Sequence, residues 1–596
     1  MPTSTTPRPD TGIVTDVAQG PAASYAGLRT AVRAVLEAGA DLTPVAEHDP
    51  AAWALLAPDG HEPVEGAPLL SEIALAPSER RLHRESEQVF RVLNTAAAAL
   101  CQASSGLGRP LVIRHAGATD LTSLRGLMRA HEYALTVPGA RLEFSDADVT
   151  TLAAGEDEDY RFERSLCLAR MGVSVAPERM RPLAPRVLEP DTAEQVLYDR
   201  ALSREASAED RLVAALAYSR SAFFSGNWEG MATVARAALP LTRGLSDGSV
   251  HGMLDAARSD EQSEAIEFEP TELSSAADLR AFLHKVLGIQ ASFRGRQDDA
   301  VRHFARMRAD GDRLSPESLA QSHLYVALVE TKRLGRLEDA AAELESGLAL
   351  LEAESATRDS IRRERGWLNN LRALVYFRQK RFRSAFTHEQ RALECINGLN
   401  DASSIHLRIN LLSNVSVLQE KAGQVENAVR TWERFRSASG SENTSFRKHH
   451  SYRAGGLSLL AGRTAAGIAE LGTSLEGALS HRDDFHEYEI RVELGSLVAR
   501  DGNADTAHRH FTLAREAGLR LGDPLRTAVA EAGAAAVLGA GVPAGVHDLL
   551  ASSVTGPGRA RDLAEGFRKG PREVLESLPL PRTKLNRPFD TVNFQE

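Results

Sequence analysis

The chain is poor in aromatic residues and in cysteine, and both shortages narrow the choice of fold and function. Aromatic residues make up 5% of the 596 residues, whereas Ala, Leu, Arg and Glu are abundant. This composition favours helices over sheets, because straight-chain side chains lose less freedom in a helix than β-branched or aromatic ones. Cys101, Cys167 and Cys395 lie far apart without CxxC spacing, which indicates neither a disulfide framework nor a zinc site. We expect Cys101 and Cys167 to be buried small hydrophobic residues.

A basic stripe and a long apolar run are also missing. The formal net charge is -11 and the arginines are dispersed, whereas a nucleic-acid-binding protein usually carries a basic patch, so direct nucleic-acid binding is not expected. No apolar run approaches the roughly 20 residues that span a bilayer. The first residues lack the basic and apolar regions of a secretory signal. We therefore expect a cytoplasmic protein without a membrane partner, long enough for two to four domains.

The informative feature is a repeated turn of the form Gly-x-x-x-x-Ala between amphipathic segments. The Gly ends one helix in a left-handed conformation, and the Ala five residues later lets the next helix approach closely. Copies begin at Gly226, Gly295, Gly335, Lys380, Gly423, Gly462 and Gly502, with a fainter one at Gly541. From 295 onward they recur every 39 to 45 residues, which indicates stacked helical hairpins.

This pattern resembles the tetratricopeptide (TPR) repeat, with a period longer than the standard one. It is similar to the stretched TPR superhelix of bacterial regulators of the maltose-activator family. The predicted fold class is mainly α, a TPR-like α-solenoid preceded by a small degenerate α/β domain. We predict a disordered N-terminus (1–20), the α/β domain (21–190), the repeat array (191–556), and a C-terminal helix with a Pro-rich tail (557–596). The acidic, Ser-rich segment 259–278 is predicted to be an insertion between repeats.

The region before the array has the pattern of a small α/β domain. Helices are expected over Ala23–Ala38 and from about Ser78 to Ser104, and strands over Leu111–Ile113 and Ala140–Phe144. A further helix opening at Asp120 makes a βαβ unit of the last two strands. Residues 112–120 resemble the Walker B region of STAND-type ATPases, which precede TPR arrays in many regulators. The strand, the loop length and Asp120 fit the resemblance, but Arg114 and His115 occupy the two acidic positions.

Residues that would support catalysis are not found. No Gly-Lys-Ser/Thr occurs, so the lysine of a phosphate-binding loop is missing, and phosphoryl transfer lacks its electrostatic stabilisers. The run HRDDFHEYE (481–489) mixes metal-binding residue types. HExxH is absent, however, and we interpret the run as a solvated loop followed by a helix start. We predict no catalytic residues, no cofactor and no metal, and therefore no binding or hydrolysis of ATP.

Candidate binding residues come from the face that the first helix of each hairpin turns inward. Residues at equal distances before successive turns fall on one inner surface of a repeat array. Aromatic and Asn side chains suit peptide capture, because rings supply contact area and Asn can bond a peptide backbone. Asn414 resembles the Asn that holds a peptide carboxylate in the chaperone-binding TPR clamp, although Leu374 replaces the partner Asn. The predicted peptide-binding residues are Tyr325, Trp367, Asn370, Phe377, Asn410, Asn414 and Tyr452.

One alternative remains open for these residues, and two remain open for the function. The aromatic rings could instead pack between repeats. For the function, we expect a non-enzymatic scaffold or adaptor that binds a protein or peptide on its concave face, with homo-oligomerisation left open. The alternatives are a STAND-like, signal-sensing transcriptional regulator with a degenerate NTPase domain, and a TPR partner subunit of a biosynthetic enzyme.

Overall fold

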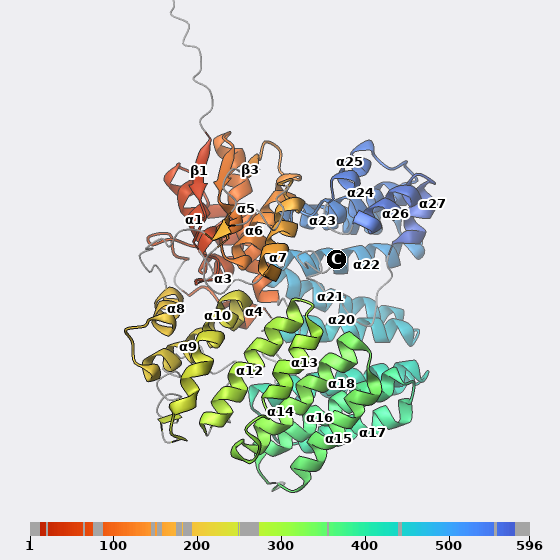
Figure 1. The fold of residues 1–596 in the computed structure, drawn as a ribbon. Helices are drawn as coiled ribbons and strands as arrows, with labels where there is room; N and C mark the ends of the chain where they lie inside the picture. Colours follow the sequence, from red (N-terminus) through yellow and green to blue (C-terminus); the bar gives the residue numbers. More distant parts are fainter. Residues whose placement is uncertain are drawn as a thin grey trace, which may run out of the picture.

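The fold consists of an α/β region followed by a long array of helical hairpins (Figure 1). In the computed structural model, the described residues are 12–19, 22–63, 66–74, 87–144, 150–151, 158–173, 181–182, 193–247, 249–250, 273, 275–354, 357–438, 444–553 and 557–578. The first 11 residues, most of the acidic segment 259–278 and residues 579–596 of the predicted tail lie outside these ranges.

The N-terminal region is built on a parallel sheet of three short strands in the order β1-β2-β3. In β2, Leu111 pairs with Ile13 of β1 and with Leu142 of β3. The elements of this region are β1 (Ile13–Asp16), α1 (Ala26–Glu37), α2 (Thr43–His48), α3 (Pro50–Trp53), α4 (Leu70–Ile73), α5 (Glu87–Leu107), β2 (Leu111–Arg114), the 3-10 helix η2 (Ala116–Ala118), α6 (Leu121–Ala134), β3 (Leu142–Phe144), β4 (Thr150–Thr151), α7 (Glu158–Arg170) and β5 (Arg181–Pro182).

The predicted βαβ unit is confirmed, with one correction. Residues 111–114 and 142–144 form strands, and Asp120 opens the helix between them, as the sequence predicts. The prediction that residues 1–20 are disordered is wrong for Ile13–Asp16, which form β1. A four-residue strand that pairs with a segment about 100 residues away leaves little local signal in a Pro- and Ser-rich stretch.

The rest of the described chain is helical. Its elements are α8 (Ala193–Leu202), α9 (Ala208–Ser225), α10 (Trp228–Ala238), η4 (Leu239–Gly244), α12 (Ala276–Phe293), α13 (Gln297–Arg306), η6 (Gly311–Arg313), α14 (Pro316–Val329), η7 (Glu330–Leu334), α15 (Leu337–Glu352), α16 (Asp359–Arg378), α17 (Phe382–Cys395), α18 (Ala402–Lys421), α19 (Val425–Ala438), α20 (Thr444–Leu460), α21 (Thr464–Ser480), α22 (Asp484–Arg500), α23 (Ala504–Arg520), α24 (Pro524–Val537), α25 (Ala544–Ser552), α26 (Pro557–Phe567) and α27 (Pro571–Ser577).

The predicted turns join these helices in pairs, so the TPR-like array is confirmed. Seven of the predicted turn residues have positive φ, including the non-glycine Lys380 at 61°, and only the last turn is shifted, to Gly539. The small residues that follow the turns are buried between the paired helices, and Ala300, Ala340, Ala385, Ala428 and Ala507 are fully buried. In the hairpin of α20 and α21, the helices approach each other at two glycines, Gly455 and Gly467. A Cβ at Gly467 would lie 3.1 Å from the Gly455 carbonyl oxygen.

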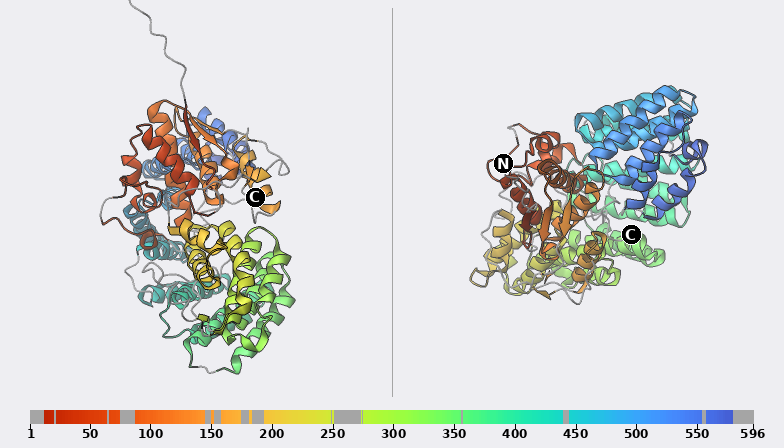
Figure 2. Two further views of the ribbon diagram at one scale, coloured as in Figure 1. Left: turned by 60° about the vertical axis from the view of Figure 1, so that its left-hand side comes forward. Right: turned by 90° about the horizontal axis from the view of Figure 1, so that it is seen from above.

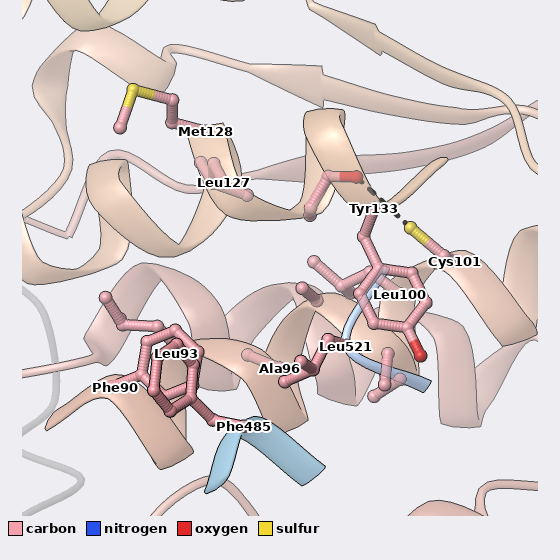
Figure 3. Close-up of a cluster of buried hydrophobic side chains, with 14 of the residues drawn as sticks. Phe90, Leu93, Ala96, Leu100, Cys101, Leu127, Met128, Tyr133, Phe485 and Leu521 are labelled. Atoms are coloured by element: carbon pink, nitrogen blue, oxygen red, sulfur yellow. Dashed lines mark hydrogen bonds between the residues drawn. The ribbon is translucent and has the colours of Figure 1, made fainter. Parts of the chain in front are cut away.

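The N-terminal region contacts the array at two places far apart in the sequence (Figures 1 and 2). The first is at α8–α10, where Arg164 of α7 pairs with Glu229 of α10 at 2.7 Å. The second is at α20–α24, where Phe90 of α5 meets Phe485 of α22 with ring centroids 5.8 Å apart. The N-terminal core is therefore continuous with that of the last repeats, and Figure 3 shows Phe485 and Leu521 packed beside α5 and α6.

The cysteine prediction is confirmed in the same core. Cys101 and Cys167 are both fully buried. The Cys101 thiol donates a hydrogen bond to the Ala130 carbonyl at 3.2 Å, as drawn in Figure 3. Burial raises the pKa of Cys101 well above its usual range, so it remains an uncharged thiol.

Candidate functional site

The carboxyl edge of the sheet is the first candidate site, because it brings the loop before α1 next to the Asp that opens α6. Asp120 is fully buried, and its Oδ1 accepts a hydrogen bond from Ser123 N at 2.8 Å, which caps α6. The same carboxylate reaches α1, where Tyr25 N lies 3.2 Å from Oδ1 and Gly27 N lies 3.3 Å from Oδ2. One carboxylate thus satisfies backbone donors at the first turns of two helices.

This geometry bears on the resemblance to STAND-type ATPases. The segment β1, loop and α1 has the strand–loop–helix order in which nucleotide-binding proteins hold a phosphate on the N–H groups that open the helix. Here the Asp120 carboxylate lies at those N–H groups, and a Cβ at Gly27 would be 2.0 Å from Thr119 Oγ1. A phosphate at the start of α1 would meet both a carboxylate and a closed space, so this arrangement disfavours a nucleotide there.

The two positions that are acidic in the Walker B pattern also differ. His115 lies in the left-handed region with φ 55°, and its Nδ1 is 3.0 Å from Asp16 Oδ1 at the end of β1. The contact of His115 with Asp16 was not predicted, because Asp16 belongs to the segment 1–20 that was expected to be disordered.

Asp120→Ala should therefore lower the free energy of unfolding by more than a single lost helix cap, which costs about 1 kcal/mol. Asp401→Ala is the matched control, because Asp401 caps a single helix, α18, and is partly exposed, with one further contact to Arg363 at 3.5 Å. Urea unfolding of the two variants gives the comparison, and ATP should change the melting temperature of neither the wild type nor the variants. Saturable stabilisation of the wild type by micromolar ATP would contradict this description of the sheet edge.

The predicted peptide-binding residues separate into two groups. Tyr325, Trp367 and Tyr452 are buried, with exposed fractions of 0%, 3% and 1%. The ring of Tyr325 stacks on Phe304 with centroids 5.0 Å apart, and Trp367 Nε1 donates to Ser403 Oγ at 3.0 Å. In this structure these three rings pack between helices, as in the alternative interpretation, and do not form a surface that a peptide could contact.

The other four predicted residues are half-buried on two neighbouring helices and are named here the inner-face strip: Asn370 and Phe377 of α16, and Asn410 and Asn414 of α18. Asn414 Nδ2 donates a hydrogen bond to Asn370 Oδ1 at 3.1 Å, which links the first helices of two successive hairpins. Phe377 lies two turns after Asn370, and its ring contacts the exposed Phe382 with centroids 5.5 Å apart. The strip therefore presents amides beside an aromatic ring.

The helix start predicted in the run 481–489 is confirmed, because α22 begins at Asp484, but the prediction that the run is solvated is wrong. Asp483 and His486 are 7% and 1% exposed, because they face the N-terminal region. The Lys448 ammonium of α20 donates to Glu87 Oε1 of α5 at 2.8 Å and also to Asp483. His486 Nδ1 lies 2.5 Å from Asp483 Oδ2. We name these four residues, Glu87, Lys448, Asp483 and His486, the junction cluster.

The junction cluster contains a set of ligand atoms suitable for a metal ion, but a protein cation occupies it. Glu87, Asp483 and His486 place ligand atoms within 4.8 Å of one another. The fully buried Lys448 ammonium is bonded to both carboxylates, so it supplies the positive charge that they need. The partners of Lys448 lie 361 and 35 residues away in the sequence. Residues so far apart do not form a recognisable sequence motif.

The charges of the junction cluster depend on one another. Burial disfavours the ionised form of Glu87, but the Lys448 ammonium outweighs burial and holds the pKa of Glu87 well below its usual range. Burial likewise opposes ionisation of Asp483, and the neighbouring His486 and Lys448 lower its pKa. Burial lowers the pKa of the adjacent His449 to about 4, so that this ring is neutral at neutral pH. The junction between the two regions is thus built on a buried ammonium between two carboxylates.

Comparisons with known proteins return only distant similarity in structure. The chain matches no protein-family model and no curated protein. Its fold is similar to the apo form of RapI (TM-score 0.28, 13% identity, 46% of this chain and 92% of RapI covered). It is also similar to the Rap conjugation gene regulator of plasmid pLS20 in complex with the Phr* peptide (TM-score 0.30, 11% identity, coverage 62% and 98%). A third similar structure is the Signal Transduction ATPase with Numerous Domains (STAND) protein with a tetratricopeptide repeat sensor from Pyrococcus horikoshii (TM-score 0.38, 12% identity, coverage 76% of each chain).

The TPR-like assignment rests on the turns and the packing of this chain itself. Among the described residues, no helix combines the length and the apolarity needed to cross a bilayer.

Proposed function

We propose that the chain is a non-enzymatic TPR-like adaptor that binds an extended protein segment along the inner-face strip. The observation that carries the proposal is the hydrogen bond between Asn414 and Asn370, 3.1 Å long, across successive repeats. The Asn370 amide nitrogen and the Asn414 carbonyl oxygen take no part in that bond. Together they offer a donor and an acceptor, the pair that an extended peptide backbone needs.

The surroundings of the two amides fit the same partner. Asn410 lies one turn before Asn414 on α18, and Phe377 lies two turns after Asn370 on α16. An aromatic ring beside backbone-binding amides gives a side chain of the partner an apolar surface to cover. The closed sheet edge at Asp120 supports a role without nucleotide chemistry.

The proposal predicts that peptides selected from a random phage-displayed library on the full-length protein depend on the two amides. Asn370→Ala and Asn414→Ala should each weaken binding of a selected peptide roughly tenfold or more, because each loses hydrogen bonds in a half-buried site. Fluorescence anisotropy with the labelled peptide measures the loss, and thermal unfolding should show only a small change.

The matched control is Asn427→Ala, since Asn427 lies on α19, the second helix of the hairpin that begins with α18, where it bonds Gln424 and Arg430. This variant should bind as the wild type does. Selected peptides that bind equally well to all three variants would place the partner elsewhere on the molecule.

A further inference from the structure

A cavity of about 150 Å³ lies where the N-terminal region meets the array. Helices α2, α5 and α6 form one side of it, and the start of α22 with the end of α23 forms the other. Part of the wall is apolar and aromatic, with Phe90, Ala98, Tyr133 and Phe485. The remainder is polar and includes members of the junction cluster. The cavity is therefore separate from the inner-face strip and belongs to neither function considered above.

Two buried polar groups of the wall have an atom without a hydrogen-bond partner among the described residues. Arg91, 7% exposed, places Nε 2.8 Å from Asp49 Oδ2 and donates from Nη2 to the His481 carbonyl at 2.8 Å, but its Nη1 bonds nothing. His486, 1% exposed, uses Nδ1 on Asp483, and its Nε2 bonds nothing. Leaving such atoms unmatched inside a protein is unfavourable, so a water or a small molecule with matching polar groups is stabilised beside them.

The two atoms require opposite partners. An arginine nitrogen is always a donor, so Nη1 of Arg91 needs an acceptor. The Asp483 carboxylate lies at His486 Nδ1 and accepts a ring proton held there, and in that tautomer Nε2 offers an acceptor. A matching molecule therefore carries an acceptor and a donor on one polar end.

The charges around the cavity are already balanced within the protein. The four carboxylates of the wall, Asp49, Glu87, Asp483 and Asp484, are matched by four cations, which are Arg91, Arg482 and Arg520 of the wall and Lys448 behind it. A charged ligand would find no surplus of the opposite sign and would lose its hydration. An apolar cavity of about 150 Å³ in another protein holds a benzene molecule, so a cavity of this volume has room for a ligand of about one ring.

We propose that this cavity is a binding site for a small neutral molecule of about one ring, with a carboxamide-like end that accepts from Arg91 and donates to His486. The ring of the ligand packs against Phe90, Tyr133 and Phe485. Because the walls come from both regions, the bound molecule holds the N-terminal region on the last repeats.

Benzamide is the probe that tests the chemistry, with benzoate, benzylamine and toluene as controls of equal size. Each is titrated into the full-length protein and followed by saturation-transfer NMR and by thermal unfolding. Benzamide should bind saturably and raise the melting temperature with concentration, since a ligand that binds only the folded state stabilises it. The three controls should bind at least tenfold more weakly. Absence of saturable benzamide binding, which would mean that water alone fills the cavity, overturns the proposal, as does equal binding of toluene.

A filling variant tests the place. Ala98→Leu adds volume inside the cavity without replacing either polar group and should abolish benzamide binding, whereas Ala54→Leu, at an exposed position outside the wall, should not. Thr95→Leu is a second filling variant, for use if circular dichroism shows that Ala98→Leu is unfolded. Benzamide that binds a folded filling variant as tightly as the wild type overturns the assignment to this cavity.

Discussion

Replacing Lys448 by methionine should lower the free energy of unfolding by about 3–5 kcal/mol, the usual effect of removing one partner from a buried ion pair. The Lys448 side chain is fully buried, and methionine keeps most of its length but not its charge. The Glu87 and Asp483 carboxylates would then lose the ammonium that is bonded to both of them inside the protein. Urea unfolding followed by circular dichroism measures the loss.

A surface pair provides the control for this prediction. Arg463 and Glu426 form an ion pair in which the two side chains are 46% and 60% exposed, so Arg463→Met should change stability by less than about 1 kcal/mol. Combining Lys448→Met with Glu87→Gln and Asp483→Asn should recover part of the loss, because the uncompensated charges are then removed. A Lys448→Met protein as stable as the wild type would mean that the N-terminal region does not dock as described.

Trp367→Ala should cost about 3–5 kcal/mol, as truncation of a buried aromatic residue does. The Trp367 ring is 3% exposed on α16, and its Nε1 bonds Ser403 Oγ of α18, so the change leaves both a cavity and an unmatched hydroxyl. Phe377→Ala, on the same helix but half-buried, should cost clearly less. Thermal and urea unfolding of the two variants, with binding of a selected peptide measured at a temperature where both are folded, give the comparison.

The outcome distinguishes packing from recognition. A ring that only packs should affect stability and leave the affinity of the folded protein for the peptide unchanged. If Trp367→Ala instead lost peptide binding while its stability stayed close to that of the wild type, the ring would belong to the binding surface and not to the contact between repeats.

The array was predictable because its signals are local. A turn residue and a small residue five positions later lie in one short segment, and even Lys380, which breaks the Gly rule, adopts the expected left-handed conformation. The strands β2 and β3, on either side of α6, were predicted for the same reason. The strand β1 was not, because its four residues depend on pairing with β2 far along the chain.

The candidate sites were predictable only in part. The spacing of the repeats placed Asn370 and Asn414 on neighbouring helices, where the structure joins them. The spacing of the repeats does not show whether a residue on the inner face of one helix is covered by the next helix. Tyr325, Trp367 and Tyr452 were therefore assigned to a surface, although they are buried. The junction cluster joins Glu87 to residues more than 350 positions later, and a polar run such as 481–489 looks the same whether water or another region covers it.

The contact of α5 and α6 with α22–α24 has a consequence for the order of folding during synthesis. Phe90 and Tyr133 leave the ribosome long before their partners Phe485 and Arg520 exist. At translation rates of about 5–20 residues per second, the 395 positions that separate Phe485 from Phe90 take on the order of 20–80 s. During that interval the apolar side of α5 is uncovered. The N-terminal region, although made first, is completed last, and the nascent chain passes through a stage at which molecular chaperones can bind it.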